Sequence, residues 1–288
     1  MHSLLFTLLI LISAGSPAQG ARFDEAVQML QQGRYQEANQ LAAQAVGQEG
    51  ENASWRHLYG LTLSALNRYQ EAEANLTKAI SLAPGNAGIY NDFGVVLLRQ
   101  KKDQEALEAF EKAVELDSDY LMARIQMGRL YHNLSRSDKA LLQFEYVAIR
   151  QPNFPTVHYH LAMIHLNNGD AARALQELKA EVGHHPGQAL VQMELGQLLT
   201  RLGKPDEAIA HLQAVRGQAP PTGRVDYLLA KAYRAAGHKQ EAIASVRRSL
   251  EIAPNDASAH YLLGQLYRET GQLDLARQAM DRFQKLQR

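Results

Sequence analysis

Histidines and carboxylates are the residues of this chain that could carry out chemistry. There are eleven histidines, and the densest group is His158, His160 and His165. A metal site on a helix needs two ligands four residues apart on one face, and none of these spacings is four. We therefore predict packing and surface histidines here, and no metal site.

The carboxylates are numerous, but their spacing points to a helix surface. Glu105, Glu108, Glu111 and Glu115 lie three or four residues apart, which is typical of a solvated helix face. The chain has no cysteine, which excludes disulfides, thiol catalysis and cysteine metal sites. It also has no glycine-rich phosphate loop with a lysine, no HExxH and no GxSxG motif. We therefore predict no cofactor and no enzymatic activity.

The overall charge argues against a nucleic-acid partner. The 30 Lys and Arg residues are balanced by 30 Asp and Glu, so the formal net charge is zero. A general nucleic-acid binder needs many uncompensated basic residues to neutralise phosphates. The hydrophobic content of 46% is enough to bury a continuous core.

A fixed sequence period organises most of the chain. With positions numbered 1 to 34 from Ala53, alanine returns at position 20 without a slip, at Ala38, Ala72, Ala106, Ala140, Ala174, Ala208, Ala242 and Ala276. Small residues also recur at position 8, where most repeats have glycine, for example Gly60 and Gly128. An unbroken period of this length indicates stacked supersecondary units.

The recurring residue types have physical causes. Small residues at positions 8 and 20 let two helices approach closely, and this packing must offset the roughly 0.5–1 kcal/mol that a helical glycine costs relative to alanine. Glycines at position 15, such as Gly169 and Gly203, suit a left-handed helix cap. Prolines at position 32 end the second helix. Pro155 and Pro205 are predicted to begin helices.

This pattern resembles the tetratricopeptide repeat (TPR), and the resemblance covers essentially the whole chain after residue 20. It implies an all-α fold, a right-handed α-solenoid (superhelix) of about eight helix-turn-helix units, one for each period of the sequence. The predicted repeats are 21–52, 53–86, 87–120, 121–154, 155–188, 189–222, 223–256 and 257–288. Glu181 and Phe283 occupy position 27, which is normally small, so we expect weakened packing near them.

The first 20 residues lie outside the repeats. Residues 4–12 are almost wholly apolar and residues 13–20 are small and polar, which is typical of a signal peptide cleaved after Ala18 or Gly20. The apolar segment is shorter than the roughly 20 residues that a membrane span needs. We predict export to the periplasm or the cell exterior, with no stable membrane span after cleavage. The alternatives are an uncleaved anchor and a wrongly assigned start.

In TPR proteins one face of the first helix lines a concave groove that binds peptides, and helix geometry places positions 2, 5, 9 and 12 on that face. No residue at these positions in repeats 2 to 8 is acidic. Three tyrosines share position 5, and aromatic and arginine side chains are the usual anchors of interfaces. The candidate partner-binding residues are Arg129, Tyr159, Gln197, Arg224, Tyr227, Lys231, Arg234, Tyr261, Gln265 and Arg268.

These features predict a non-catalytic, exported scaffold or adaptor that binds a protein or peptide. We expect the ligand to carry acidic groups or a free C-terminus, bound near repeats 6 to 8 by charge-assisted hydrogen bonds. One alternative is a solvated groove wall whose tyrosines pack between repeats. A second is an accessory protein that binds an envelope polysaccharide or cell-wall polymer. The apolar side of residues 274–288 is also predicted to support self-association.

Overall fold

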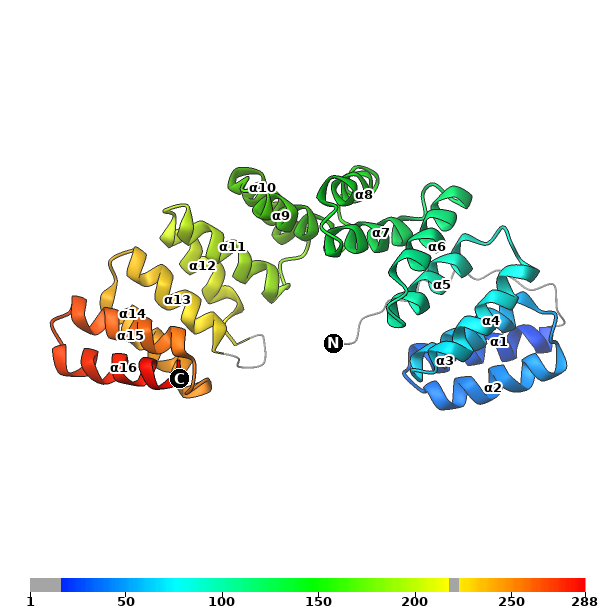
Figure 1. The fold of residues 1–288 in the computed structure, drawn as a ribbon, viewed down its shortest axis with the longest axis horizontal. Helices are drawn as coiled ribbons and strands as arrows, with labels where there is room; N and C mark the ends of the chain where they lie inside the picture. The colour runs from blue at the N-terminus through cyan, green and yellow to red at the C-terminus, as the bar shows by residue number, and fades with distance from the viewer. Residues whose placement is uncertain (1–16, 218–222, 288) are drawn as a thin grey trace. The chain divides into compact units, whose positions relative to one another are not determined.

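The computed structural model describes residues 17–217 and 223–287, which form sixteen α-helices and no β-strand (Figure 1). The predicted all-α fold of helical repeats is confirmed. The chain divides into two compact units, Met1–Val147 (unit 1) and Ala148–Arg288 (unit 2), and the division falls in the last turn of α8 (Ser137–Arg150).

Unit 1 contains seven further helices. They are α1 (Pro17–Gln31), α2 (Tyr35–Gln48), α3 (Ala53–Ala65), α4 (Tyr69–Leu82), α5 (Ala87–Arg99), α6 (Asp103–Leu116) and α7 (Leu121–Asn133). From α1 to α7 each helix packs against the next one in the chain. The first helices of successive repeats, α1, α3, α5 and α7, also contact one another, which is the arrangement expected for a face lined by first helices.

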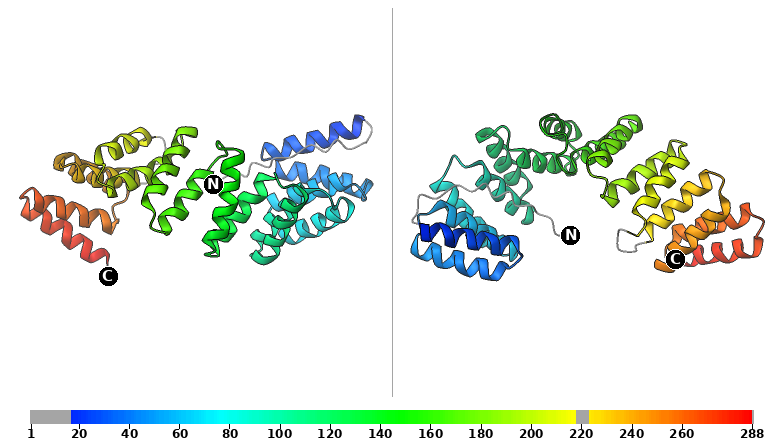
Figure 2. Two further views of the ribbon diagram at one scale, coloured as in Figure 1. Left: turned by 90° about the horizontal axis from the view of Figure 1, so that it is seen from above. Right: turned by 180° about the vertical axis from the view of Figure 1, so that it is seen from behind.

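Unit 2 contains eight helices. They are α9 (Val157–Asn167), α10 (Ala171–His184), α11 (Ala189–Arg201), α12 (Pro205–Val215), α13 (Arg224–Ala235), α14 (Lys239–Ile252), α15 (Ala257–Glu269) and α16 (Leu273–Leu286). From α9 to α16 every helix again packs against its successor, and Figure 2 shows the helices of each unit from two further sides.

The N-terminal region is only partly described. Residues 1–16 of the predicted signal peptide lie outside the described residues, and Pro17 to Gly20 already belong to α1. No helix in the described part of the chain is long and apolar enough to cross a membrane.

The repeat positions explain where helices end. Gly169, Gly203, Gly237 and Gly271 at position 15 all have a positive φ, between 73° and 81°, as the sequence predicts. Asn67, Lys101 and Ser135 hold the same position with φ of 58–62°, so this left-handed turn forms even without glycine. Pro205 begins α12, as predicted, because the first residue of a helix needs no N–H partner.

The two helices of a repeat are in close contact at positions 8 and 20. All eight alanines at position 20 are buried, with at most 8% of their surface exposed. A Cβ atom built on Gly60 would lie 2.7 Å from Leu76, and one on Gly128 would lie 2.7 Å from the ring of Phe144. Both distances are shorter than a normal van der Waals contact, so at these two sites a Cβ would force the side chain at position 24 to move.

Repeat 5 differs from the prediction at its start. Pro155 does not begin the helix, because α9 starts two residues later, after Thr156 in the left-handed conformation. Glu181 is fully buried and lies against this later start of α9. Its carboxyl group accepts hydrogen bonds from the backbone N of Thr156 at 2.9 Å and of Tyr159 at 3.4 Å. The expected weakening of packing at Glu181 is therefore wrong, since the side chain caps the helix.

A hydrogen bond that the sequence analysis missed joins successive repeats. The side chain at position 4 donates a hydrogen bond to the backbone carbonyl at position 32 of the preceding repeat, at 2.9–3.1 Å. The pairs are Arg56–Gly50, Arg124–Ser118, His158–Pro152, Gln192–Pro186 and His260–Pro254. His158, which the sequence assigned to packing, is thus a polar link between repeats.

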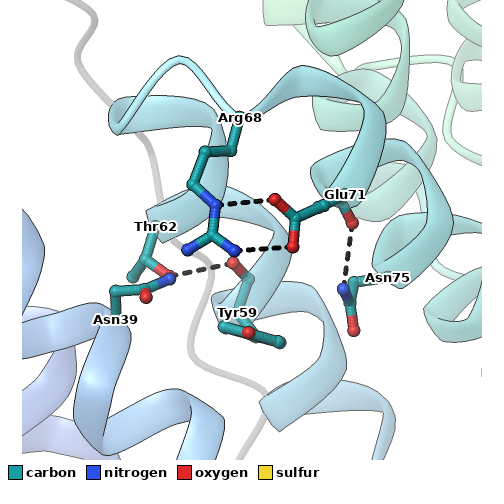
Figure 3. A network of polar contacts seen from close by, with 6 residues as sticks. All are labelled: Asn39, Tyr59, Thr62, Arg68, Glu71 and Asn75. Atoms are coloured by element: carbon teal, nitrogen blue, oxygen red, sulfur yellow. Dashed lines mark hydrogen bonds and ion pairs between the residues drawn. The ribbon is translucent and has the colours of Figure 1, made fainter.

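Polar contacts also connect repeats 1 and 2, as Figure 3 shows. Asn39 of α2 is buried and donates its Nδ2 proton to Thr62 Oγ1 of α3 at 3.0 Å. Thr62 in turn donates to the backbone carbonyl of Tyr59. At the start of α4, Arg68 pairs with Glu71 three residues later, which places opposite charges on the first turn.

Candidate functional site

Five of the predicted groove residues surround one pocket in unit 2. They are Tyr227, Lys231 and Arg234 on α13 and Tyr261 and Gln265 on α15, and the pocket has a volume of about 560 Å³. Its other lining residues are Thr200, Ala235, Ser258, Leu262 and Phe283. We call these ten residues the unit 2 pocket.

Helix periodicity explains why these side chains meet. Tyr227 and Lys231 are four residues apart on α13, as are Tyr261 and Gln265 on α15, so each pair lies on one helix face. Both helices are first helices of their repeats, and therefore the same positions recur side by side. Phe283 of α16 completes the pocket, with its ring centre 5.1 Å from that of Tyr261. The large residue at position 27 of the last repeat thus contributes to the pocket wall.

The two basic residues of the pocket differ in whether a carboxylate neutralises them. Arg234 donates to Gln265 Oε1 at 2.6 Å and forms an ion pair with Glu269. Lys231 lies with its Nζ 5.8 Å from the ring centre of Tyr227. Within residues 17–217 and 223–287, no carboxylate forms an ion pair with Lys231. Lys231 therefore supplies the net positive charge of the pocket.

Tyr227 stays neutral over a wide pH range. Burial raises the pKa of its hydroxyl, and the negative charge of Asp256 raises it further. A neutral phenol can donate one hydrogen bond and accept another while its ring makes apolar contact. This combination suits a ligand that is partly apolar and partly polar.

The remaining predicted residues do not line this pocket. Arg224 pairs with Glu194 at 2.7 Å, and both charges influence the nearby Tyr159, whose pKa is raised mainly by burial. Gln197 is half-buried and Arg268 is exposed elsewhere in unit 2. Arg129 is exposed in unit 1.

The positive charge of the predicted groove is smaller than its sequence suggests. Glu194 at position 6 and Glu269 at position 13 lie next to the groove-facing positions, and their carboxylates neutralise two of the five basic residues. The sequence analysis missed these partners because it considered only positions 2, 5, 9 and 12. For the same reason it missed Ala235, Leu262 and Phe283 of the pocket.

The described residues contain no group of three or more His, Asp or Glu side chains that could hold a metal ion. The densest histidines are used in hydrogen bonds or packing. His158 contacts Glu177 at 2.6 Å, and its ring stacks on that of His184 with the centres 5.7 Å apart.

Comparison with protein families places the chain in a known class. A family model described as Tetratricopeptide repeat matches residues 23–87, 60–120, 125–189 and 227–287, and a second with the same description matches residues 165–232. The chain belongs to the tetratricopeptide repeat family. No curated protein matches it.

Solved structures are similar to the chain in fold. One is YrrB, described as a TPR protein with an unusual peptide-binding site, with 25% identity and a TM-score of 0.56 over 64% of this chain and 95% of YrrB. A tetratricopeptide repeat protein from Parabacteroides merdae has 17% identity and a TM-score of 0.59, covering 87% of this chain and 99% of that one. The C-terminal part of a TPR protein from Cytophaga hutchinsonii has 16% identity and a TM-score of 0.66, covering 84% and 99%. The last two similarities show the fold alone.

Proposed function

We propose that this protein is a non-catalytic scaffold that binds a peptide segment of another protein in the unit 2 pocket. The observation that carries the proposal is the pocket itself, where two tyrosines and a phenylalanine from successive repeats lie beside Lys231, which has no ion pair within the described part of the chain. Membership of the TPR family and the similarity to YrrB, a peptide-binding TPR protein by its description, support the same function.

The pocket chemistry favours a segment that contains a carboxylate beside an apolar side chain. Lys231 can bind the carboxylate by a charge-assisted hydrogen bond. Tyr227, Tyr261 and Phe283 offer aromatic surface for the apolar part. Arg234 is held in place by Gln265 and Glu269, so its remaining N–H groups are donors in a fixed position. Either an acidic side chain or a free C-terminus meets these requirements.

Affinity capture from the native envelope fraction tests this proposal. The bait is the mature chain, compared with a Tyr227→Ala, Lys231→Ala variant and with Arg247→Ala as a control that removes an exposed charge of α14 in unit 2 outside the pocket. We expect the wild type and the control to retain the same proteins and the pocket variant to lose them. A peptide from a captured protein should bind the pocket variant at least tenfold more weakly, a loss of about 1.4 kcal/mol.

Two other outcomes decide against the proposal. Equal capture by all three baits, each with an unchanged melting temperature, would exclude the unit 2 pocket as the binding surface. Retention of cell-wall polymer without protein would favour the polysaccharide-binding alternative.

The proposal includes export, which the composition of residues 1–20 supports. Mass spectrometry of the protein from the native envelope fraction should find Gln19 or Ala21 as the first residue. An intact N-terminus in the membrane would instead support the uncleaved anchor.

A further inference from the structure

Unit 1 has a pocket of its own, with a volume of about 540 Å³. It lies between α1, α3 and α5 and the segment that joins α6 to α7. Phe23 and His57, both at position 5 of their repeats, contribute to it together with Asp92 of α5. Asp117 and Tyr120, which follow α6, complete its polar lining. We call this the unit 1 pocket.

The unit 1 pocket is acidic. Asp92 and Asp117 are its carboxylates, and no lysine or arginine among the described residues lines it. Each carboxylate oxygen of Asp92 has a hydrogen-bond partner. His57 Nε2 lies 2.7 Å from Oδ2, and Asn91 donates to Oδ1 at 3.1 Å. The side chain of Asp92 is only 16% exposed. A fixed carboxylate with little access to water attracts a cation more strongly than an exposed one does.

The negative charges of both carboxylates affect the pKa of the Tyr120 hydroxyl group. The pKa of Tyr120 is raised to about 12, first by burial and then by the negative charges of Asp92 and Asp117. The two carboxylates come from different elements, Asp92 from within α5 and Asp117 from directly after α6, and both line the pocket.

The shape of the pocket suits a long side chain. Gly88 lines it at position 2, where a Cβ would lie 3.2 Å from Asn86 Oδ1 and 3.5 Å from the Tyr120 hydroxyl, so a larger side chain at this residue would take up space beside Tyr120. Phe23, Leu58 and Leu116 add an apolar wall. Such a wall fits the methylene groups of a basic side chain while its charged end meets the carboxylates.

We propose that the unit 1 pocket binds an arginine side chain of a protein partner between the carboxylates of Asp92 and Asp117. A guanidinium presents five N–H donors in one plane and can serve two carboxylates at once, and it is more weakly hydrated than an ammonium group. The site is independent of the unit 2 pocket, since it lies in the other unit and has the opposite charge.

The chain contains a natural reporter for this site. Trp55 is its single tryptophan, and its ring lies edge-on to Phe23 with the ring centres 5.0 Å apart. A ligand that moves Phe23 should therefore change the fluorescence of Trp55. The probe is the acetylated and amidated peptide Ala-Ala-Arg-Ala-Ala. Its matched control has citrulline, which is nearly isosteric with arginine but uncharged.

Titration of the full chain should give a saturable change in Trp55 fluorescence with the arginine peptide. We expect at least tenfold weaker binding of the citrulline peptide to the wild type, and of the arginine peptide to Asp92→Asn, Asp117→Asn. Gly88→Leu should also weaken binding at least tenfold, because it fills the pocket and keeps both carboxylates. Asp103→Asn removes an exposed carboxylate of α6 outside the pocket and should bind like the wild type.

Equal binding of the two peptides would overturn the proposal, as would wild-type affinity in both Gly88→Leu and the neutralised variant. The absence of a saturable change up to roughly 10 mM peptide, an affinity too weak to count as recognition, would overturn it as well. None of these results affects the unit 2 pocket, whose variants are separate.

Discussion

At the scale of single residues, departures from the repeat pattern carry specific structural roles. Glu181 replaces a small residue and supplies the acceptor that the shortened start of α9 needs. It also accepts a hydrogen bond from Gln188 Nε2 at 2.9 Å, which links α10 to the residue directly before α11. Buried backbone N–H groups must be satisfied, so an acidic side chain at this position is compatible with tight packing.

Replacing Glu181 by alanine should expose this dependence. The change leaves the N–H groups of Thr156 and Tyr159 and the amide of Gln188 without their acceptor, at a cost of about 1–3 kcal/mol in the stability of unit 2. Hydrogen exchange followed by mass spectrometry should show faster exchange at Thr156 and Tyr159. Glu181→Gln, which keeps an acceptor oxygen, is the matched control. Unchanged exchange in the alanine variant would contradict the capping role.

His158 should make the stability of unit 2 depend on pH. Its hydrogen bond with Glu177 raises the pKa of the imidazole above its ordinary value of about 6.5. The protonated form is thus favoured by folding, so this contribution is fully present below pH of about 6.5 and is lost as the pH rises through the raised pKa.

His158→Gln isolates this effect, because Gln192 already makes the same bond to the preceding repeat at position 4 of repeat 6. The melting temperature of the wild type should exceed that of the variant by more at pH 5.5 than at pH 9. A difference that does not vary with pH would rule out a contribution from His158 ionisation.

At the scale of elements, each repeat is a helix pair whose spacing depends on two complementary positions. In repeat 4, position 8 is Gly128 and position 24 is Phe144. A Cβ atom built on Gly128 would lie 2.7 Å from the ring of Phe144. In repeat 5 position 8 is Ala162 and position 24 is Leu178, and both are fully buried. The pair, and not either residue alone, therefore determines how closely the helices approach.

Gly128→Ala should destabilise unit 1. Overpacking costs about 1–3 kcal/mol, whereas the better helix propensity of alanine returns at most about 1 kcal/mol. In the Gly128→Ala background, Phe144→Leu should be less harmful than in the wild type, because the double variant recreates the pair found in repeat 5. Denaturation of the four proteins gives the coupling energy, expected to be about 1 kcal/mol or more. Simple additivity would show that the two residues do not share this contact.

At the scale of the whole molecule, stability should be local. In a repeat protein each repeat contacts only its neighbours, so a defect acts mainly on the repeats around it. The chain divides into two compact units, and its single tryptophan, Trp55, lies in unit 1 and is 3% exposed. Trp55 fluorescence therefore reports on unit 1, whereas circular dichroism reports on the helices of both units.

This separation allows a direct test. In urea, Glu181→Ala should shift the circular dichroism transition and leave the midpoint of Trp55 fluorescence nearly unchanged, because Glu181 lies in unit 2. Gly128→Ala, in unit 1, should shift the fluorescence midpoint. Equal shifts of both signals in each variant would mean that the whole chain unfolds as a single cooperative unit.

The sequence by itself determined the repeat fold. A fixed period forces the same local contacts in every repeat, so the buried alanines, the glycine turns at position 15 and the helix start at Pro205 follow from spacing and residue type. The sequence also predicted that positions 5 and 9 share one helix face. Tyr227, Lys231, Tyr261 and Gln265 stand at these positions, and all four line one pocket.

Only the tertiary structure decided which charges are paired and where pockets form. The ion pairs of Arg224 and Arg234 join residues 30 and 35 positions apart, with partners at positions that helix periodicity does not assign to the groove. The unit 1 pocket depends on Gly88 and on residues that follow α6, which come together only when repeats stack. A repeating pattern specifies contacts that recur in every repeat, whereas binding sites arise from side chains that differ between repeats.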